Sequence, residues 1–398
     1  MQYHDTSALL KRGLQLPDPA SVWVDRAIDL GRIEPGSRLE PGVRLEGELT
    51  TLGPDCHLGV EGPVVLKNVA TGRGVKVASG SVENAVLLDA ASLGPAAHVR
   101  GASLLEEGAS TGHAVGLKQS LLLSFATLGS NVNFCDCLIT GGRSRADHSE
   151  VGSGFIHFNF TPFGARGDKA TASLFGDVPR GVLMREDRVF LGGAGGVVGP
   201  VTIGFGTVLA AGSVYRRSYA DHLLVYGESL PSKKVAFDPM VVKGADRRLR
   251  ACRQYIAQLR ALRSWYREVR LGRSTLNSSP DWEQRLLLAA IGGIEAAERE
   301  RFKQADRLVA NLEWALINRA DAYQGELAAM SKAARDLWKR LKESKSPLGE
   351  IPASLAADLS RAPSASHLDW LGEMKQAVAT EATAWMQSIV ECQSAIFD

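Results

Sequence analysis

An apolar, mostly aliphatic residue recurs at every sixth position between about residue 33 and residue 215. The repeat is visible at Ile33, Leu39, Leu45, Leu52, Leu58, Val64, Leu93, Val99, Val115, Leu121, Leu128, Phe134, Val197 and Ile203. A lone helix repeats every 3.6 residues and a lone strand every two, so neither element explains a period of six. The period therefore belongs to a larger unit and predicts a solenoid.

The residue after the apolar one is usually small or acidic, as in Leu52-Gly53, Leu128-Gly129 and Ile203-Gly204. Each unit of six is then a short flat strand and a tight corner, with the aliphatic side chain pointing to the axis. Three units close one triangular coil of about 18 residues, and coils stack at the parallel-strand spacing of about 4.8 Å. The span leaves room for roughly eight to ten coils, which cover one another's inner faces.

The six-residue period stops after residue 235, where glycine becomes sparse and Ala, Leu, Glu, Arg and Trp recur at helical spacing. We expect helices over 240–272, from Ser279-Pro280-Asp281 to about 318, over 320–344, and from about 364 to near the C-terminus. The first of these helices is rich in Arg, and we expect a solvated face with ion pairs to acidic residues of the next helix. Amphipathic helices of this kind are typical of an antiparallel bundle or hairpin.

The two patterns divide the chain into three parts. We predict a lead-in segment at 1–30, a parallel β-helix at 31–235 with a long loop at about 143–190, and an α-helical domain at 236–398.

Composition is that of an ordinary globular chain. It has 398 residues, a formal net charge of +2 and 45% hydrophobic residues, so no global field favours nucleic acid or membrane. No apolar run approaches the roughly 20 residues that a membrane helix needs, and the first residues do not read as a signal peptide. The five Cys are scattered, which is typical of reduced thiols. We expect a cytoplasmic protein that binds neither nucleic acid nor membrane.

The hexapeptide pattern resembles the left-handed β-helix of hexapeptide-repeat acyltransferases. Within that family, residues 93–118 and 154–212 are similar to the acetyltransferase half of the bifunctional N-acetylglucosamine-1-phosphate uridylyltransferase/glucosamine-1-phosphate acetyltransferase. The resemblance covers about residues 30–235. It implies that the β-helix is left-handed and that the protein is a homotrimer. It also implies that acetyl-CoA binds as co-substrate in grooves between the triangular β-helices of neighbouring subunits.

The resemblance also implies a set of substrate-binding residues. Arg100 and Lys118 fall on an Arg and a Lys that hold the sugar phosphate, and Asn159 falls on the Asn of a long Asn-Tyr loop, in which Phe160 replaces the Tyr. Lys169, in the same loop, is a further candidate for the phosphate of sugar or coenzyme. For the coenzyme we expect Gly193, Gly195 and Ala211 to provide a surface of close approach for the pantetheine arm.

Acetyl transfer to an amine requires a base, and a His oriented by a carboxylate suits that role. His148 is the first candidate, because it lies between Asp147 and Glu150 in the irregular stretch that interrupts the coils. His157 is the second: strand alternation puts it on one face with Asn159, and we expect this face outward if the prism interior takes Ile156, Phe158 and Phe160. His113 is a third. No metal is expected; a three-His site as in γ-class carbonic anhydrases would need His on adjacent coils.

Some positions depart from the family pattern. Gly193 stands where the relative has a Ser near the thioester, and no Arg follows the last coil at the expected place. The repeats begin after only some thirty residues, so uridylyl transfer is not expected. The sequence thus predicts an acyl-CoA-dependent transferase for an amino sugar, its phosphate or a nucleotide sugar. The alternatives are a non-catalytic trimeric scaffold and a nucleotide-sugar-binding regulatory subunit.

Overall fold

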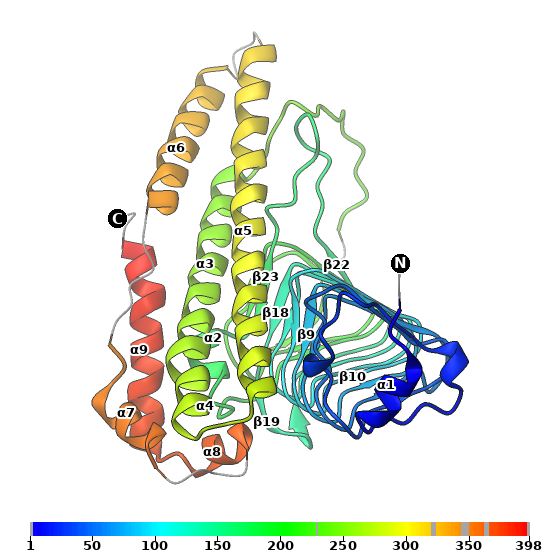
Figure 1. Cartoon of the computed structure of the whole chain (residues 1–398). Coiled ribbons are helices and arrows are strands. Elements are labelled where there is room, and N and C mark those ends of the chain that lie inside the picture. The colour runs from blue at the N-terminus through cyan, green and yellow to red at the C-terminus, as the bar shows by residue number, and fades with distance from the viewer. Residues whose placement is uncertain (1–2, 228–229, 320–323, 344–349, 362–365, 396–398) are drawn as a thin grey trace.

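A computed structural model describes residues 3–227, 230–319, 324–343, 350–361 and 366–395. The chain forms a triangular prism of stacked parallel strands, and a group of long helices stands against one side of it (Figure 1). The predicted architecture, a left-handed parallel β-helix followed by an α-helical domain, is confirmed.

The prism has three faces, each a parallel sheet. The first face contains β1 (Trp23–Val24), β3 (Arg44–Glu46), β5 (Val64–Lys67), β8 (Gly80–Glu83), β11 (Ala97–Arg100), β14 (Gly116–Lys118), β17 (Asn133–Cys135), β22 (Ile156–Phe158), β25 (Gly196–Val198) and β28 (Val214–Tyr215). The second face contains β2 (Arg38–Leu39), β4 (His57–Leu58), β7 (Lys76–Val77), β10 (Ser92–Leu93), β13 (Ser110–Thr111), β16 (Thr127–Leu128), β21 (Glu150–Val151), β24 (Phe190–Leu191), β27 (Val208–Leu209) and β29 (Leu224–Val225). The third face contains β6 (Ala70–Thr71), β9 (Ala85–Leu87), β12 (Ser103–Leu105), β15 (Leu121–Leu122), β18 (Cys137–Ile139), β23 (Ser173–Phe175) and β26 (Thr202–Ile203).

The apolar residues of the six-residue period point into the prism, one from each face of each coil, and stack in columns along its axis. On the second face, Leu39 pairs with Leu58, Leu58 with Val77, and Leu93 with Val77, and all four side chains are at most 2% exposed. Each coil contributes one such residue per face, so the core is a stack of aliphatic layers that no single coil could bury.

The corner between the first and third faces is made by one residue in the left-handed backbone region. Asn68, Asn84, Ala102, Gln119 and Asp136 all have φ between +49° and +60°. Only one or two residues separate the strands at this corner, as at Asn84 between β8 and β9, so the chain passes from the end of a first-face strand almost directly into the third face. It therefore brings the ends of the first-face strands close to whatever covers the third face.

Residues 143–190, expected as one long loop, are three excursions separated by strands of the prism. The first is an antiparallel hairpin of β19 (Gly142–Ser144) and β20 (Asp147–His148). The second is the loop 159–172 between β22 and β23, and the third carries the short helix α2 (Val178–Gly181). The coils thus continue through the interruption.

The first helical segment after the prism is α3 (Ala245–Ser264), which continues through a π-helix (Trp265–Leu271) into α4 (Gly272–Leu276). The others are α5 (Asp281–Asn318), α6 (Gln324–Glu343), α7 (Ala353–Leu359), α8 (His367–Glu373) and α9 (Gln376–Ala395), and a short helix α1 (Thr6–Lys11) precedes the prism. The predicted starts of α5 and α6 lie within a few residues of those observed. The last predicted helix is two helices, α8 and α9, because the backbone is extended at Met374. None of the described helices is long and apolar enough to cross a membrane.

Helices α3 and α5 cover the third face (Figure 1). Outward side chains of that face, such as Leu104, Leu121 and Leu138, are at most 2% exposed and join one apolar cluster with Leu259 and Ile294 of the helices. A strand that is buried on both sides reads as a continuous apolar run, which explains the sequence Leu121-Leu122-Leu123.

The Arg-rich face of the first long helix is solvated only in part: Arg247, Arg250 and Arg267 are exposed, but three other Arg side chains are buried. Arg248 and Arg260 are 4% and 5% exposed, and Arg270 of the π-helix is 6% exposed. Each forms an ion pair within the chain: Arg260 with Glu298 of α5 at 2.7 Å, Arg248 with Asp168 at 2.7 Å, and Arg270 with Glu107. The expected ion pairs to the next helix are present, since Arg263 and Arg267 also pair with Glu298 and Glu295 of α5. The pairs of Arg248 and Arg270 with the β-helix were not expected.

Candidate functional site

A cavity of about 150 Å³ lies at the corner between the first and third faces, where the prism meets α5. Its lining residues are Arg100, Lys118, Gln119, Asn133, Cys135, Asp136, His157, Asn159, Lys169 and Gln304. All four residues expected to bind the substrate are among them, together with one of the candidate bases. The structure therefore brings together residues that are up to 69 positions apart within the β-helix and adds one from α5.

The basic residues come from the ends of neighbouring strands. Arg100 ends β11 and Lys118 ends β14, and the two residues are paired directly in the parallel ladder. Because Val99 and Leu117 before them point into the core, alternation turns Arg100 and Lys118 outward. Their Cα atoms are thus one strand spacing apart, about 4.8 Å, which gives two adjacent cations at the mouth of the cavity.

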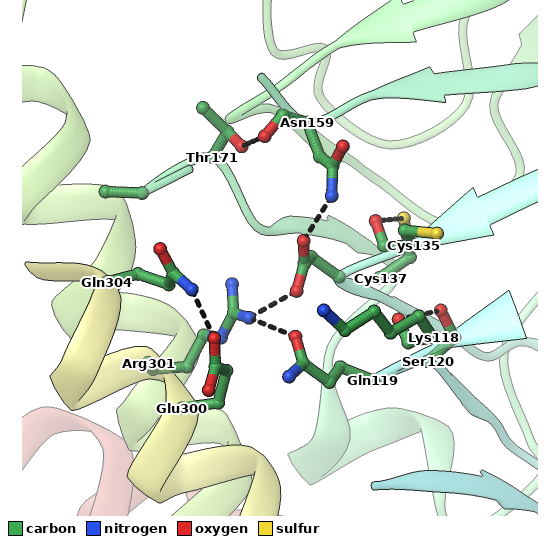
Figure 2. Close-up of polar contacts among 12 residues, drawn as sticks. Lys118, Gln119, Ser120, Cys135, Cys137, Asn159, Thr171, Glu300, Arg301 and Gln304 are labelled. Atoms are coloured by element: carbon green, nitrogen blue, oxygen red, sulfur yellow. Dashed lines mark hydrogen bonds and ion pairs between the residues drawn. The ribbon is translucent and has the colours of Figure 1, made fainter. Parts of the chain in front are cut away.

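Asp136 lines the buried end of the cavity, which we call its floor, and its charge is neutralised by an ion pair to the helical domain. It is paired with Arg301 of α5, and the side chains are 4% and 2% exposed. Arg301 Nη2 also donates to Gln119 Oε1 at 2.8 Å, and Asn159 Nδ2 donates to Asp136 Oδ2 (Figure 2). Burial alone would lower the pKa of Arg301, but the Asp136 carboxylate raises it above the ordinary value.

The remaining charge of the cavity is positive. With Asp136 matched by Arg301, the charged residues of the lining are Arg100, Lys118 and Lys169. Three cations around a cavity of this size suit an anion such as a phosphate or sulfate group.

The loop that carries Lys169 is held by the helical domain. Arg248 of α3 pairs with Asp168 at 2.7 Å, and the Asp168 side chain is 1% exposed. Asn311 of α5 donates from Nδ2 to the carbonyl of Gly167 at 2.9 Å. The position of Lys169 therefore depends on contacts from both helices.

His157 lines the cavity but does not face outward. Ile156 and Phe158 are 39% and 41% exposed, whereas His157 is 3% exposed and pairs with the buried Val197. The expected facing of this strand was therefore wrong, because the core accepts His157 and leaves the larger apolar side chains on the surface.

Both ring nitrogens of His157 are engaged. Nδ1 lies 2.6 Å from the Cys135 carbonyl oxygen, which can only accept, so Nδ1 carries the proton. Nε2, 2.8 Å from Ser173 Oγ, then accepts from that hydroxyl. Burial lowers the pKa of His157 to about 4, so the ring is neutral near pH 7.

His148 lies at a different corner of the prism, in the β19–β20 hairpin between the third and second faces. Its Nδ1 is 2.8 Å from the Arg145 carbonyl oxygen, and Asp147 is 3.8 Å from Arg188. His148, Asp147 and Glu150 are not among the residues that line the cavity. His113 is exposed at the corner between the second and first faces, where Nδ1 is 2.7 Å from Ser130 Oγ. The structure thus separates the first candidate base from the basic cluster.

The expected coenzyme residues lie at the corner between the second and first faces of the last coils. A Cβ atom on Gly193 would be 2.6 Å from the Ser153 carbonyl oxygen, and one on Gly195 would be 2.6 Å from that of Ser213. Close stacking of neighbouring coils thus already requires glycine at both positions. Ala211 is exposed on the next coil.

A larger cavity, of about 480 Å³, lies at the corner between the third and second faces, against α4 and the start of α5. Its charged lining residues balance, because three Arg are matched by three carboxylates, and Arg270 pairs with Glu107. Asp89 is mostly buried there, and desolvation raises its pKa to about 6. The smaller cavity is the stronger candidate, because it carries an excess of one charge. Among the described residues, no group of three or more His, Cys, Asp or Glu side chains is placed to hold a metal ion.

Comparison with known proteins identifies relatives that match about half of the chain. The chain is 31% identical over 212 residues to the bifunctional protein GlmU of Nocardia farcinica, which is 52% of this chain and 37% of that protein. It is 28% identical over 220 residues to GlmU of Synechococcus elongatus, covering 42% of it, and 31% identical over 225 residues to GlmU of Methylococcus capsulatus, covering 43%. The chain thus matches less than half the length of these relatives. No family model matches the chain. The solenoid and these relatives confirm the predicted resemblance to hexapeptide-repeat acetyltransferases.

Proposed function

We propose that this chain is an acyl-CoA-dependent transferase that acylates the amino group of an amino-sugar phosphate. The single observation that carries the proposal is the cavity in which Arg100, Lys118, Lys169 and Asn159 meet. The similarity to GlmU supports a transferase at the level of the family. The acceptor, acetyl-CoA as donor, a homotrimer and a cytoplasmic location are parts of the same proposal.

In this proposal the three cations hold the phosphate. Arg100 can form two parallel hydrogen bonds to phosphate oxygens, and Lys118 and Lys169 act as point charges beside it. The amide nitrogen of Asn159 donates a hydrogen bond to Asp136, so the amide oxygen can accept one from a hydroxyl group of the sugar.

The reaction joins the sugar nitrogen to the thioester carbonyl. The C–N bond forms, the C–S bond breaks, the thiolate leaves and takes up a proton, and the nitrogen loses one. We assign the proton from nitrogen to Nε2 of His157, which is neutral and has its lone pair turned to the Ser173 hydroxyl. A base with a pKa of about 4 cannot deprotonate a free ammonium group, so the amine must arrive neutral. Its proton becomes acidic only as the nitrogen attacks.

We place acetyl-CoA in a groove between neighbouring prisms of the trimer. Gly193, Gly195 and Ala211 lie on an outer corner that such a groove could follow. The absence of bulky side chains at Gly193 and Gly195 supports a close approach of the pantetheine arm, in addition to the stacking of coils.

One observation favours a second candidate function, which is binding of a sugar phosphate without transfer. Both nitrogens of His157 have partners inside the protein, and His148 lies at another corner. A protein of this kind would act as a sensor or regulatory subunit.

Calorimetry combined with a thiol-release assay separates the two candidates. Both bind glucosamine-1-phosphate, but only the transferase also binds acetyl-CoA and releases thiol when both ligands are present. Sugar-phosphate binding with neither acetyl-CoA binding nor thiol release would replace the transferase with the binding protein.

A further inference from the structure

Gln304 of α5 lines the cavity and carries a hydrogen-bond acceptor that has no partner. Its side chain is 4% exposed and lines the cavity, and its Oε1 atom is buried without a hydrogen-bond partner. A buried polar atom without a partner costs free energy, so such atoms are uncommon unless a ligand or water supplies the missing group.

The orientation of the Gln304 amide follows from the hydrogen bond of its nitrogen atom. Nε2 donates to Glu300 Oε1, one turn earlier on the same helix (Figure 2). A carboxylate can only accept, so the nitrogen must face Glu300, and the oxygen is the atom left over.

Apart from the Asn159 amide oxygen, which the proposed function assigns to a sugar hydroxyl, the other side-chain acceptors around Asp136 are already used. Gln119 Oε1 accepts from Arg301, and the two oxygens of Asp136 accept from Arg301 and Asn159. The three cations can only donate. Gln304 Oε1 is thus a second acceptor without a partner among the residues that line the cavity, and an N–H or O–H group of a ligand held by Arg100 and Lys118 would supply the missing donor.

We propose that Gln304 is a specificity-determining residue of this cavity, whose Oε1 accepts a hydrogen bond from an amino or hydroxyl group of the bound sugar phosphate. This inference rests on the proposed sugar-phosphate ligand, but it does not require that the ligand be acylated. It gives the helical domain a direct part in recognising the ligand, since Gln304 belongs to α5.

The test is calorimetric titration of the full chain with glucosamine-1-phosphate and, separately, with inorganic phosphate. Gln304→Leu and Gln304→Met keep the volume and remove the acceptor. Gln284→Leu, on the same helix and outside the cavity lining, is the matched control. Thermal melting of each variant checks that it is folded.

We expect both Gln304 variants to bind glucosamine-1-phosphate about tenfold more weakly or worse, as the loss of one hydrogen bond to a buried group implies. Their affinity for inorganic phosphate should be unchanged, and the control should match the wild type with both ligands. Equal weakening with both ligands, no weakening with either, or a wild type that does not bind glucosamine-1-phosphate would overturn the inference. Selective weakening in a chain that releases no thiol would leave it standing and remove only the transferase.

Discussion

Arg301 of α5 forms a buried ion pair with Asp136, which lies 165 residues earlier at the corner between the first and third faces. The same guanidinium holds Gln119, and the same carboxylate holds Asn159. The helical domain and the cavity floor are thus one hydrogen-bonded unit, and the charge left to the cavity is that of its three other cations.

Replacing Arg301 with Met should destabilise the fold strongly. It would leave the Asp136 carboxylate buried without its cation, which typically costs about 3–5 kcal/mol. Urea denaturation measures the free energy of unfolding. Arg250→Ala is the control, because Arg250 pairs with Asp246 at the surface and such pairs contribute about 0.5 kcal/mol or less. Equal losses in the two variants would contradict a buried, structure-determining pair.

Replacing Lys118 with Met should weaken binding of glucosamine-1-phosphate at least tenfold, because a charge-assisted hydrogen bond to phosphate is lost. Calorimetry at two salt concentrations should also give a shallower dependence of affinity on salt than in the wild type, since one fewer cation faces the anion. Lys76→Met, an exposed Lys on the second face, should bind as the wild type does. Unchanged affinity in Lys118→Met would exclude this cavity as the phosphate site.

The two candidate bases should respond differently to mutation. His157→Ala should reduce thiol release by about a hundredfold or more, the usual contribution of a general base. His148→Ala should retain wild-type activity, because His148 lies in the hairpin at another corner. The measurement is kcat with saturating acetyl-CoA and glucosamine-1-phosphate. Loss of activity only in His148→Ala would contradict this assignment and make His148 the base. Because His148 does not line the cavity of its own chain, it would then have to reach the cavity of a second subunit.

Stability should depend on pH through His157. Its pKa is lowered by burial from 6.5 to about 4, so between these values the unfolded chain binds more protons than the folded one. The free energy of unfolding should therefore fall as pH drops from 7.5 to 5, with His157 contributing about 2 kcal/mol of the loss. Urea denaturation at both pH values should give a smaller difference for His157→Gln than for the wild type. An identical difference would show that His157 is not neutral and buried.

The β-helix could be predicted because the same pattern of inward apolar residues recurs from coil to coil. Its strands need only an aliphatic residue at each inward position, as in the column of Leu39, Leu58 and Val77. The resemblance placed Arg100 and Lys118 in one site, and the structure pairs them because residues 18 apart fall on neighbouring strands.

The part played by the helices could not be predicted in the same way. Nothing near Arg301 or Gln304 in the sequence indicates a site, because their meaning depends on how α5 docks on the third face. One signal was available: Leu121-Leu122-Leu123 is apolar on both sides of a strand, which indicates a covered face. The direction in which His157 points could not be predicted either. Alternation along a strand divides its residues into two faces, but it does not say which face is buried in the core.

Steady-state thiol release by the full chain tests the proposed transferase most directly. It is measured with acetyl-CoA and each of three acceptors: glucosamine-1-phosphate, glucosamine and glucose-1-phosphate. The proposed transferase should give saturable release with glucosamine-1-phosphate, much weaker release with glucosamine, which lacks the phosphate, and none with glucose-1-phosphate, which lacks the amine. No release above background with glucosamine-1-phosphate, or equal release with glucosamine, would contradict it.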